Sequence, residues 1–225
     1  MAEQLVFALV EAEPPTFANF VAGPNSEAIA ALARAASARG GEAITLWGAE
    51  GAGKSHLLRA FAAAAAAAGR TAHYVAAPAD ADAADAAECV AIDQVDRADT
   101  DAEARLFTLF NAVRAREGQW VAAARLPAAR SALRDDLRTR LGWGLTFEVR
   151  ALDDADKPGA LMAYARQRGF ELGDDVIAYL LAHGRRDMRS LTATLAALDR
   201  YSLSTRRAIS VPLLRDWMAS PQLPL

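Results

Sequence analysis

A short apolar run followed by a glycine-rich octet constrains this chain more than any other feature. Residues 43–47 are predicted to form a buried strand because they are mostly apolar and end at a glycine. The octet that follows is Gly48, Ala49, Glu50, Gly51, Ala52, Gly53, Lys54 and Ser55. Apolar residues at helical spacing continue to position 61. The pattern G-x-x-x-x-G-K-S between a strand and a helix is typical of a phosphate-binding P-loop.

The residue types of this octet suit a phosphate ligand. Glycines let several backbone N–H groups converge on one anion, and the following helix directs its positive end there. Lys54 is expected to contact the β- and γ-phosphates, and the Ser55 hydroxyl to bind Mg²⁺. The alternative is a chance glycine-rich turn, which we disfavour because the complete octet lies between a strand and a helix. We therefore expect the chain to bind a nucleoside triphosphate or diphosphate.

A carboxylate at the end of a later strand fits the same site. Residues 90–93 are predicted to form an apolar strand that ends in Asp93. In P-loop proteins a carboxylate in this place holds the metal, and we expect Asp93 to bind Mg²⁺ through water. The next residue is Gln94, whose neutral amide cannot act as a general base toward an attacking water molecule.

The composition bears on which classes of protein fit this chain. The chain has 225 residues, of which 53% are apolar, enough for the core of one α/β domain and a small second unit. Its net charge of −3 argues against a dedicated nucleic-acid binder, which would show a basic surface. The single cysteine, Cys89, is expected in the core. Because we find neither a basic leader nor about 18 uninterrupted apolar residues, we expect a cytoplasmic protein without membrane contact.

Strands and helices alternate along the first two thirds of the chain. Beyond residues 43–47, the predicted strands lie at residues 71–75, 90–93, 120–124 and 145–149. This alternation is typical of an α/β fold with a parallel, doubly wound sheet. Residues 101–117 are expected to form an amphipathic helix and residues 131–141 an arginine-rich one. The acidic stretch 77–88 is expected to be a solvated loop or frayed helix rather than a metal site.

Near residue 152 the pattern changes to helices alone. These are predicted at residues 153–168, 173–183, 186–202 and 209–219. We therefore expect three parts: a short apolar peptide at residues 1–13, an α/β nucleotide-binding domain at 14–151, and a small helical lid domain at 152–225.

Three separate stretches resemble the DnaA branch of the AAA+ family. They are TFANFVAGPNSEA at residues 16–28, GAEGAGKSHLLRAF at 48–61 and RLFTLFNAV at 105–113. The resemblance runs from Thr16 to the C-terminus. It implies a P-loop AAA+ module with a parallel five-stranded sheet flanked by helices and a C-terminal helical lid, and ADP or ATP as the nucleotide. The initiator's DNA-binding helix-turn-helix domain is expected to be absent, because the sequence ends after the lid.

The resemblance gives two arginines a role at a nucleotide. Arg189 matches the lid arginine, called sensor 2, that reaches back to the phosphates of the bound nucleotide. Arg140 matches the arginine finger that one subunit offers to its neighbour's γ-phosphate, so it would act catalytically in trans. Without the resemblance, Arg140 is predicted to be a charge on a helix surface. Gln94, and Arg125 in place of a polar sensor residue, both favour poor hydrolysis by this chain itself.

The N-terminal peptide resembles the Gln-Leu-x-Leu-x-Leu type of sliding-clamp-binding peptide. The residues expected to contact the clamp are Gln4, Leu5, Phe7 and Leu9. From the residues alone, an edge strand folded back on the body of the protein is at least as well supported.

Two functions follow from the resemblance. The first is a regulatory adaptor that binds the β sliding clamp of DNA polymerase III and stimulates hydrolysis of ATP bound to DnaA, which inhibits replication initiation. Such an adaptor would contact DNA only through the clamp and would lie in the bacterial cytoplasm at the nucleoid. It would show little or no ATPase activity of its own. A homo-oligomer is compatible with this role. The alternative is a stand-alone AAA+ ATPase or DnaA-like loader acting on nucleic acid or a partner protein. Basal ATP turnover distinguishes the two.

Overall fold

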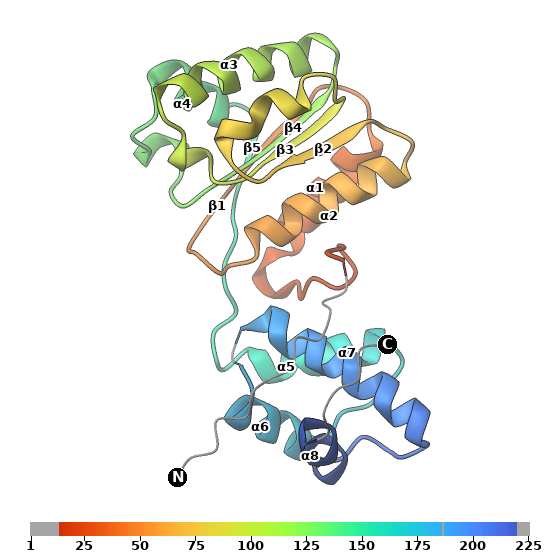
Figure 1. Ribbon diagram of the computed structural model, residues 1–225. Coiled ribbons are helices and arrows are strands. Elements are labelled where there is room, and N and C mark those ends of the chain that lie inside the picture. The colour runs from red at the N-terminus through yellow and green to blue at the C-terminus, as the bar shows by residue number, and fades with distance from the viewer. Residues whose placement is uncertain (1–13, 186, 220–225) are drawn as a thin grey trace. The chain divides into compact units, whose positions relative to one another are not determined.

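The structure, a computed structural model, describes residues 14–185 and 187–219 (Figure 1). The polypeptide divides into two compact units: an α/β unit, Pro15–Leu152, and a helical unit formed by residues 153–219. In these described ranges, no helix is both long and apolar enough to span a membrane.

A five-stranded parallel sheet forms the centre of the α/β unit. Its strands are β1 Ala43–Trp47, β2 Ala72–Val75, β3 Cys89–Ile92, β4 Gln119–Ala124 and β5 Leu145–Glu148. Their order in the sheet is β2-β3-β4-β1-β5, and every neighbouring pair is parallel. This confirms the predicted parallel sheet. It also places β1, which leads into the P-loop, between two strands that come much later in the chain.

Helices cover both faces of this sheet (Figure 1). The first face carries α1 Ser26–Ser37 and α2 Lys54–Ala67, and the second carries α3 Thr100–Ala115 and α4 Asp135–Leu141. Side chains along each strand alternate between the two resulting cores. In β3, Cys89 and Ala91 join the α1/α2 core, whereas Val90 and Ile92 join the α3/α4 core. This period of two is what a strand with both faces buried requires, and it confirms that Cys89 is a core residue.

The acidic stretch at residues 77–88 is partly helical, is kinked at Asp80 (φ −94°, ψ 15°), and has exposed aspartates. Most of it forms the 3₁₀-helical segment η2 Pro78–Ala84. Ala81 and Ala84 are buried in the α3/α4 core, whereas Asp80 and Asp82 are exposed. The small alanine side chains let the backbone approach the core closely, which the acidic composition alone did not indicate.

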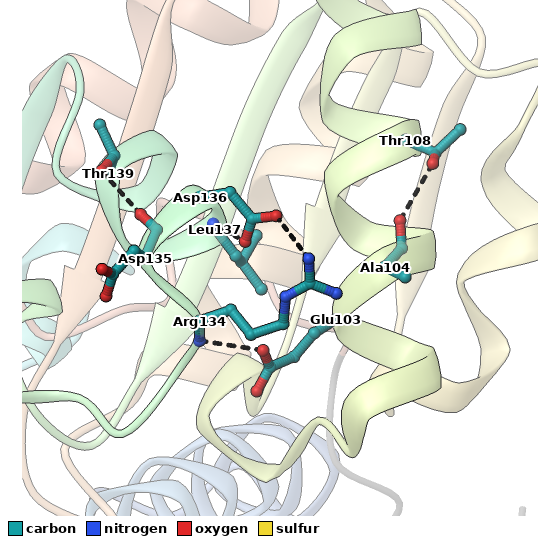
Figure 2. A network of polar contacts seen from close by, with 8 residues as sticks. All are labelled: Glu103, Ala104, Thr108, Arg134, Asp135, Asp136, Leu137 and Thr139. Atoms are coloured by element: carbon teal, nitrogen blue, oxygen red, sulfur yellow. Dashed lines mark hydrogen bonds and ion pairs between the residues drawn. The ribbon is translucent and has the colours of Figure 1, made fainter.

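The arginine-rich helix is shorter than predicted at its N-terminal end. α4 begins at Asp135, because Arg134 has extended backbone angles of φ −54° and ψ 147°. The Arg134 N–H donates to the Glu103 carboxylate on α3 at 2.9 Å rather than to a helical carbonyl (Figure 2). Asp136 accepts from the Arg134 guanidinium and from the Leu137 N–H. A carboxylate from a different helix therefore sets the start of α4, and the residues before Arg134 form only the short 3₁₀ segment η4 Ala128–Arg130.

The described part of the helical unit is a small bundle. Its helices are α5 Lys157–Gln167, α6 Asp174–His183, α7 Met188–Thr205 and α8 Val211–Ala219. Buried side chains from all four form its core, among them Leu161, Leu180, Leu195 and Leu213. Asp187 caps α7, because its carboxylate accepts a hydrogen bond from the Ser190 N–H at 2.9 Å. The bundle agrees with the predicted C-terminal helical lid.

Candidate nucleotide-binding site

The carboxyl ends of three adjacent strands carry the polar residues of the candidate site. Gly48 follows β1, Arg125 follows β4 and Asp93 follows β3. Because β4 lies between β1 and β3, one strand separates the P-loop from Asp93, and adjacent strands are about 4.8 Å apart. The carboxyl edge of an open parallel sheet is the place where such folds bind ligands. The sheet order thus brings together the predicted phosphate-binding loop and the predicted metal ligand.

The P-loop, residues 48–55, requires glycine at two positions for steric reasons. Gly48 has a φ of 151°, and a Cβ there would lie 2.2 Å from the Val149 carbonyl oxygen. Gly53 has a φ of 99°, and a Cβ there would lie 2.6 Å from the Phe20 ring. Gly53 is also the N-cap residue of α2, so the loop turns directly into the helix. The backbone therefore forms a cradle that side chains would fill, and this fits a phosphate group at the helix N-terminus.

Lys54 begins α2 and folds back over the P-loop. Its ammonium group donates to the carbonyl oxygens of Gly48 and Ala49, at 2.7 Å each. Burial lowers the pKa of Lys54, and Arg125 lowers it further, whereas three nearby carboxylates act in the opposite sense. These carboxylates are Asp93, Asp96 and Glu50. A phosphate could replace the two carbonyl oxygens as the acceptor of the Lys54 ammonium group. Because this ammonium group is partly buried, its electrostatic attraction to the phosphate would be stronger than in water.

Asp93 is buried at the end of β3 and held in one orientation. It is 3% exposed. The Tyr74 hydroxyl donates to its Oδ2 at 3.0 Å, and the Gln94 N–H donates to its Oδ1 at 2.9 Å. Burial raises the pKa of Tyr74, and Asp93 raises it further, so the hydroxyl stays protonated and able to donate. Mg²⁺ prefers oxygen ligands, and Asp93 and Ser55 are the residues that would hold it beside the phosphates.

Gln94 has a structural role in the turn that leaves β3. Its backbone lies in the left-handed region, with φ 53°, and its side-chain amide donates to the Ala76 carbonyl oxygen at 3.2 Å. The amide is neutral and anchors the turn, so it has no proton-accepting group to offer an attacking water molecule.

Sequence reasoning missed one acidic residue at this sheet edge. Asp96, in the 3₁₀ segment η3 Val95–Arg97, accepts from Arg125 Nε through its Oδ2 at 2.7 Å. The signal that could have found it is an acid in the turn just after Asp93. The site therefore contains a second cation besides Lys54, paired with a second carboxylate.

Arg140, the predicted arginine finger, lies in the last turn of α4. Its guanidinium carbon lies 5.3 Å from the centre of the Phe107 ring and 5.8 Å from that of the Trp143 ring. Its Nε is buried, with no hydrogen-bond partner among the described residues. Arg114 lies 4.5 Å from the same Trp143 ring. Arg140 is partly buried, so the guanidinium of this helix-surface residue also contacts two aromatic rings. Its action in trans stays a prediction.

The remaining predicted residues belong to other parts of the sequence. Arg189 is exposed in the first turn of α7, in the helical unit. Its contact with the phosphates stays a prediction. The four residues expected to contact the clamp, Gln4, Leu5, Phe7 and Leu9, lie outside the described part of the chain.

The sheet is parallel and has the strand order given above, with a P-loop after β1 and a carboxylate after β3. A helical bundle follows it in the chain. Together these features define a P-loop module of the AAA+ class. Comparison with known proteins is more specific. Residues 154–218 match the family described as "Hda, lid domain".

Several solved structures have a similar fold. Domain III of the replication initiation protein DnaA from Thermotoga maritima is 22% identical, with a TM-score of 0.65 over 91% of this chain and 97% of that one. AMPPCP-bound DnaA from Aquifex aeolicus is 22% identical, with a TM-score of 0.65 over 82% of this chain and 64% of that one. The RuvB Holliday junction branch migration motor from Thermotoga maritima is 15% identical, with a TM-score of 0.51 over 79% and 61%.

These similarities confirm the AAA+ fold predicted from the sequence. The match to the Hda lid family covers residues 154–218, and the likeness to DnaA is one of fold.

Proposed function

We propose that this chain is a nucleotide-binding regulator of replication initiation that stimulates hydrolysis of ATP bound to DnaA, in the manner of Hda, the regulatory inactivator of DnaA. It would act while attached to the β sliding clamp of DNA polymerase III, and it would reach DNA only through that clamp. The single observation that carries the proposal is the match of residues 154–218 to the Hda lid family.

The geometry of the P-loop supports nucleotide binding. The glycine cradle would receive the phosphates, Lys54 would neutralise them, and Asp93 with Ser55 would hold Mg²⁺. DnaA from Aquifex aeolicus, which has the same fold, was solved with the nucleotide analogue AMPPCP. Because Gln94 supplies no general base, we propose that the bound ADP or ATP mainly stabilises the protein and is turned over slowly.

The surroundings of Arg140 support its proposed action in trans. A cation placed at a γ-phosphate stabilises the charge that develops during phosphoryl transfer, and arginine fingers contribute about 10³–10⁵-fold in rate. Contacts with Phe107 and Trp143 restrict the guanidinium before any partner arrives. Less conformational entropy is then lost when the partner binds, which favours a residue that must meet a phosphate in a defined geometry.

The proposed attachment to the clamp rests on the N-terminal sequence. Replacing Gln4 and Leu5 together by alanine is expected to abolish pull-down by the clamp without a change in melting temperature. An unchanged pull-down would show that these residues do not form a clamp-binding peptide.

The decisive experiment measures hydrolysis of ATP by DnaA in the presence of DNA-loaded clamp. Wild-type protein is compared with Arg140→Ala and with Arg138→Ala, a matched control in the same helix. Arg138 pairs with Asp135 at 2.6 Å and is 40% exposed, so its removal changes the net charge by the same amount. We expect stimulation by wild type and by Arg138→Ala, and loss of at least tenfold in stimulation with Arg140→Ala.

The outcomes separate the parts of the proposal. Equal stimulation by all three proteins would remove Arg140 from the mechanism. No stimulation by wild type would contradict the regulatory function.

A stand-alone AAA+ ATPase or DnaA-like loader is the second candidate. The presence of Lys54, Ser55 and Asp93 at one sheet edge favours it. Rapid ATP turnover by the purified chain, abolished by Lys54→Ala, would support this candidate and contradict a purely regulatory role.

A further inference from the structure

Tyr74 reaches the predicted metal ligand from the edge strand of the sheet. It lies on β2, which the strand order places at one edge, next to β3. Tyr74 pairs with Ala91, and the pairing continues beyond β3, where the Asp93 N–H donates to the Val75 carbonyl oxygen at 2.9 Å. Ala91 belongs to the α1/α2 core, and Tyr74 packs against that core. By the alternation along a strand, Tyr74 and Asp93 lie on the face that carries the P-loop helix α2.

The Tyr74 hydroxyl orients a buried carboxylate. Oδ2 of Asp93 accepts from this hydroxyl at 3.0 Å, and Oδ1 accepts from the Gln94 N–H at 2.9 Å. One donor on each oxygen fixes the rotation of the carboxylate group. An ionised carboxylate has about four acceptor sites, so further sites on Asp93 stay available beside these two hydrogen bonds. The Gln94 donor belongs to the backbone, whereas the Tyr74 donor can be removed by changing one side chain.

Arg59 lies against the ring of Tyr74. Its guanidinium carbon is 4.9 Å from the centre of the ring, a cation–π distance that restricts the ring. Arg59 follows Ser55 by four residues on α2, and residues four apart lie on the same side of a helix. The side of α2 that carries Ser55, one predicted Mg²⁺ ligand, therefore also carries the residue in contact with Tyr74. Tyr74 in turn contacts Asp93, the other predicted ligand.

We propose that Tyr74 is a positioning residue that orients Asp93 toward Mg²⁺ and so sets how strongly the metal increases nucleotide affinity. The inference rests on the nucleotide binding proposed above. In this assignment Tyr74 acts only through Asp93. Its removal should therefore weaken the contribution of Mg²⁺ and leave the phosphate contacts of the P-loop in place.

A purely structural hydroxyl would give a different result. Tyr74→Phe keeps the ring and removes only the donor. Leaving a buried carboxylate with one donor fewer should lower stability in either case, so stability alone does not decide. Only the positioning role predicts an effect on nucleotide affinity that depends on Mg²⁺. Partners that orient metal ligands typically contribute about 10–100-fold to metal affinity, and we expect the lower end because Asp93 is predicted to hold Mg²⁺ through water.

The test measures dissociation constants for AMPPCP and for ADP by titration calorimetry, each with Mg²⁺ and with EDTA, on the full-length chain freed of nucleotide. The Mg²⁺ gain is the factor by which Mg²⁺ lowers the dissociation constant. Wild type is compared with Tyr74→Phe, Asp93→Asn, the double variant and Tyr164→Phe. Tyr164, on α5 of the helical unit, is the matched control because it is 5% exposed and its hydroxyl accepts from Arg168 Nη1 at 3.2 Å. Thermal unfolding checks that each variant is folded.

For Tyr74→Phe we expect the Mg²⁺ gain for AMPPCP to fall roughly tenfold, with binding in EDTA changed by less than about twofold. Tyr164→Phe should keep the wild-type gain. Asp93→Asn should lose most of the gain, and adding Tyr74→Phe to it should have no further effect, because the hydroxyl acts through that carboxylate.

The outcomes distinguish this inference from the function on which it rests. A wild-type Mg²⁺ gain in folded Tyr74→Phe, or a further loss in the double variant, would overturn the inference and leave nucleotide binding intact. A wild-type affinity that did not depend on Mg²⁺ would overturn it together with the predicted role of Asp93. If wild type bound neither AMPPCP nor ADP, the nucleotide-binding part of the proposed function would be wrong as well.

Discussion

The Thr45 hydroxyl connects β1 to the end of the helix that carries Arg140. It donates to the Leu141 carbonyl oxygen at 2.7 Å, and Thr45 is 2% exposed. Leu141 is the last residue of α4, where carbonyl groups have no intrahelical partner. Replacing Thr45 by valine keeps the shape and the strand propensity of the side chain, and removes only the donor.

The expected cost follows from this geometry. A net hydrogen bond contributes about 0.5–1.5 kcal/mol, and a buried acceptor left without a partner costs about 1–3 kcal/mol. Because valine introduces no cavity, we expect Thr45→Val to lower the free energy of unfolding by roughly 1–2 kcal/mol. For a domain of this size, that corresponds to a fall of roughly 2–8 °C in the melting temperature.

The assay is thermal unfolding followed by tryptophan fluorescence, since Trp47, Trp120 and Trp143 all lie in the α/β unit. Thr146→Val is the matched control: Thr146 is the register partner of Thr45 on β5, and it is exposed. Its replacement should change stability by less than about 0.5 kcal/mol. If Thr45→Val were no more destabilising than Thr146→Val, the buried hydroxyl would not anchor α4 and the reasoning would fail.

Three further predictions concern other buried or capping groups. Glu103→Ala should cost about 1–2 kcal/mol, because the Arg134 N–H loses its acceptor, whereas Glu103→Gln keeps a carbonyl acceptor and should cost less in the same thermal assay. Burial acts to raise the pKa of Asp187, but hydrogen bonds from Ser190 outweigh burial, so the pKa is lowered. The ionised Asp187 cap should therefore stabilise α7 fully above pH ~4, and this stabilisation should be lost as the pH falls further. Urea unfolding of the wild type against Asp187→Ala, as a function of pH, checks this, and a constant difference between them down to pH 2 would contradict it. Burial raises the pKa of the Cys89 thiol, so a thiol reagent should modify native protein only as fast as the protein opens, and rapid modification would refute this.

The sheet and the P-loop could be predicted because their signals are local. An apolar run, a complete phosphate-binding octet and a terminal carboxylate each occupy a few consecutive residues, from Gly48 to Ser55 and at Asp93. The sheet order then follows from pairing between strands, and it brought these segments to one edge as expected for a doubly wound fold.

The start of α4 could not be predicted because its cause is distant in sequence. Glu103 lies on α3, and its carboxylate captures the Arg134 N–H that would otherwise belong to a helical turn. The pairing of Asp96 with Arg125 is of the same kind, since it joins a 3₁₀ segment after β3 to the end of β4. The periodicity of apolar residues predicts single helices and strands. These two contacts join different elements, so they depend on which elements the order of strands in the sheet brings side by side.

The close packing around Gly48 affects the conformational entropy that the P-loop would lose when a nucleotide binds. The Val149 carbonyl leaves no room beside Gly48, and α2 starts directly after Gly53, so both ends of the loop are fixed by the sheet and the helix. Little backbone entropy is then lost on binding, because the loop need not fold around the ligand. What must change is the pair of hydrogen bonds between Lys54 and the carbonyl oxygens of Gly48 and Ala49, which the phosphates would replace. Association of a nucleotide with this loop would therefore require one ammonium group to exchange its hydrogen-bond acceptors, and would not require the loop to fold.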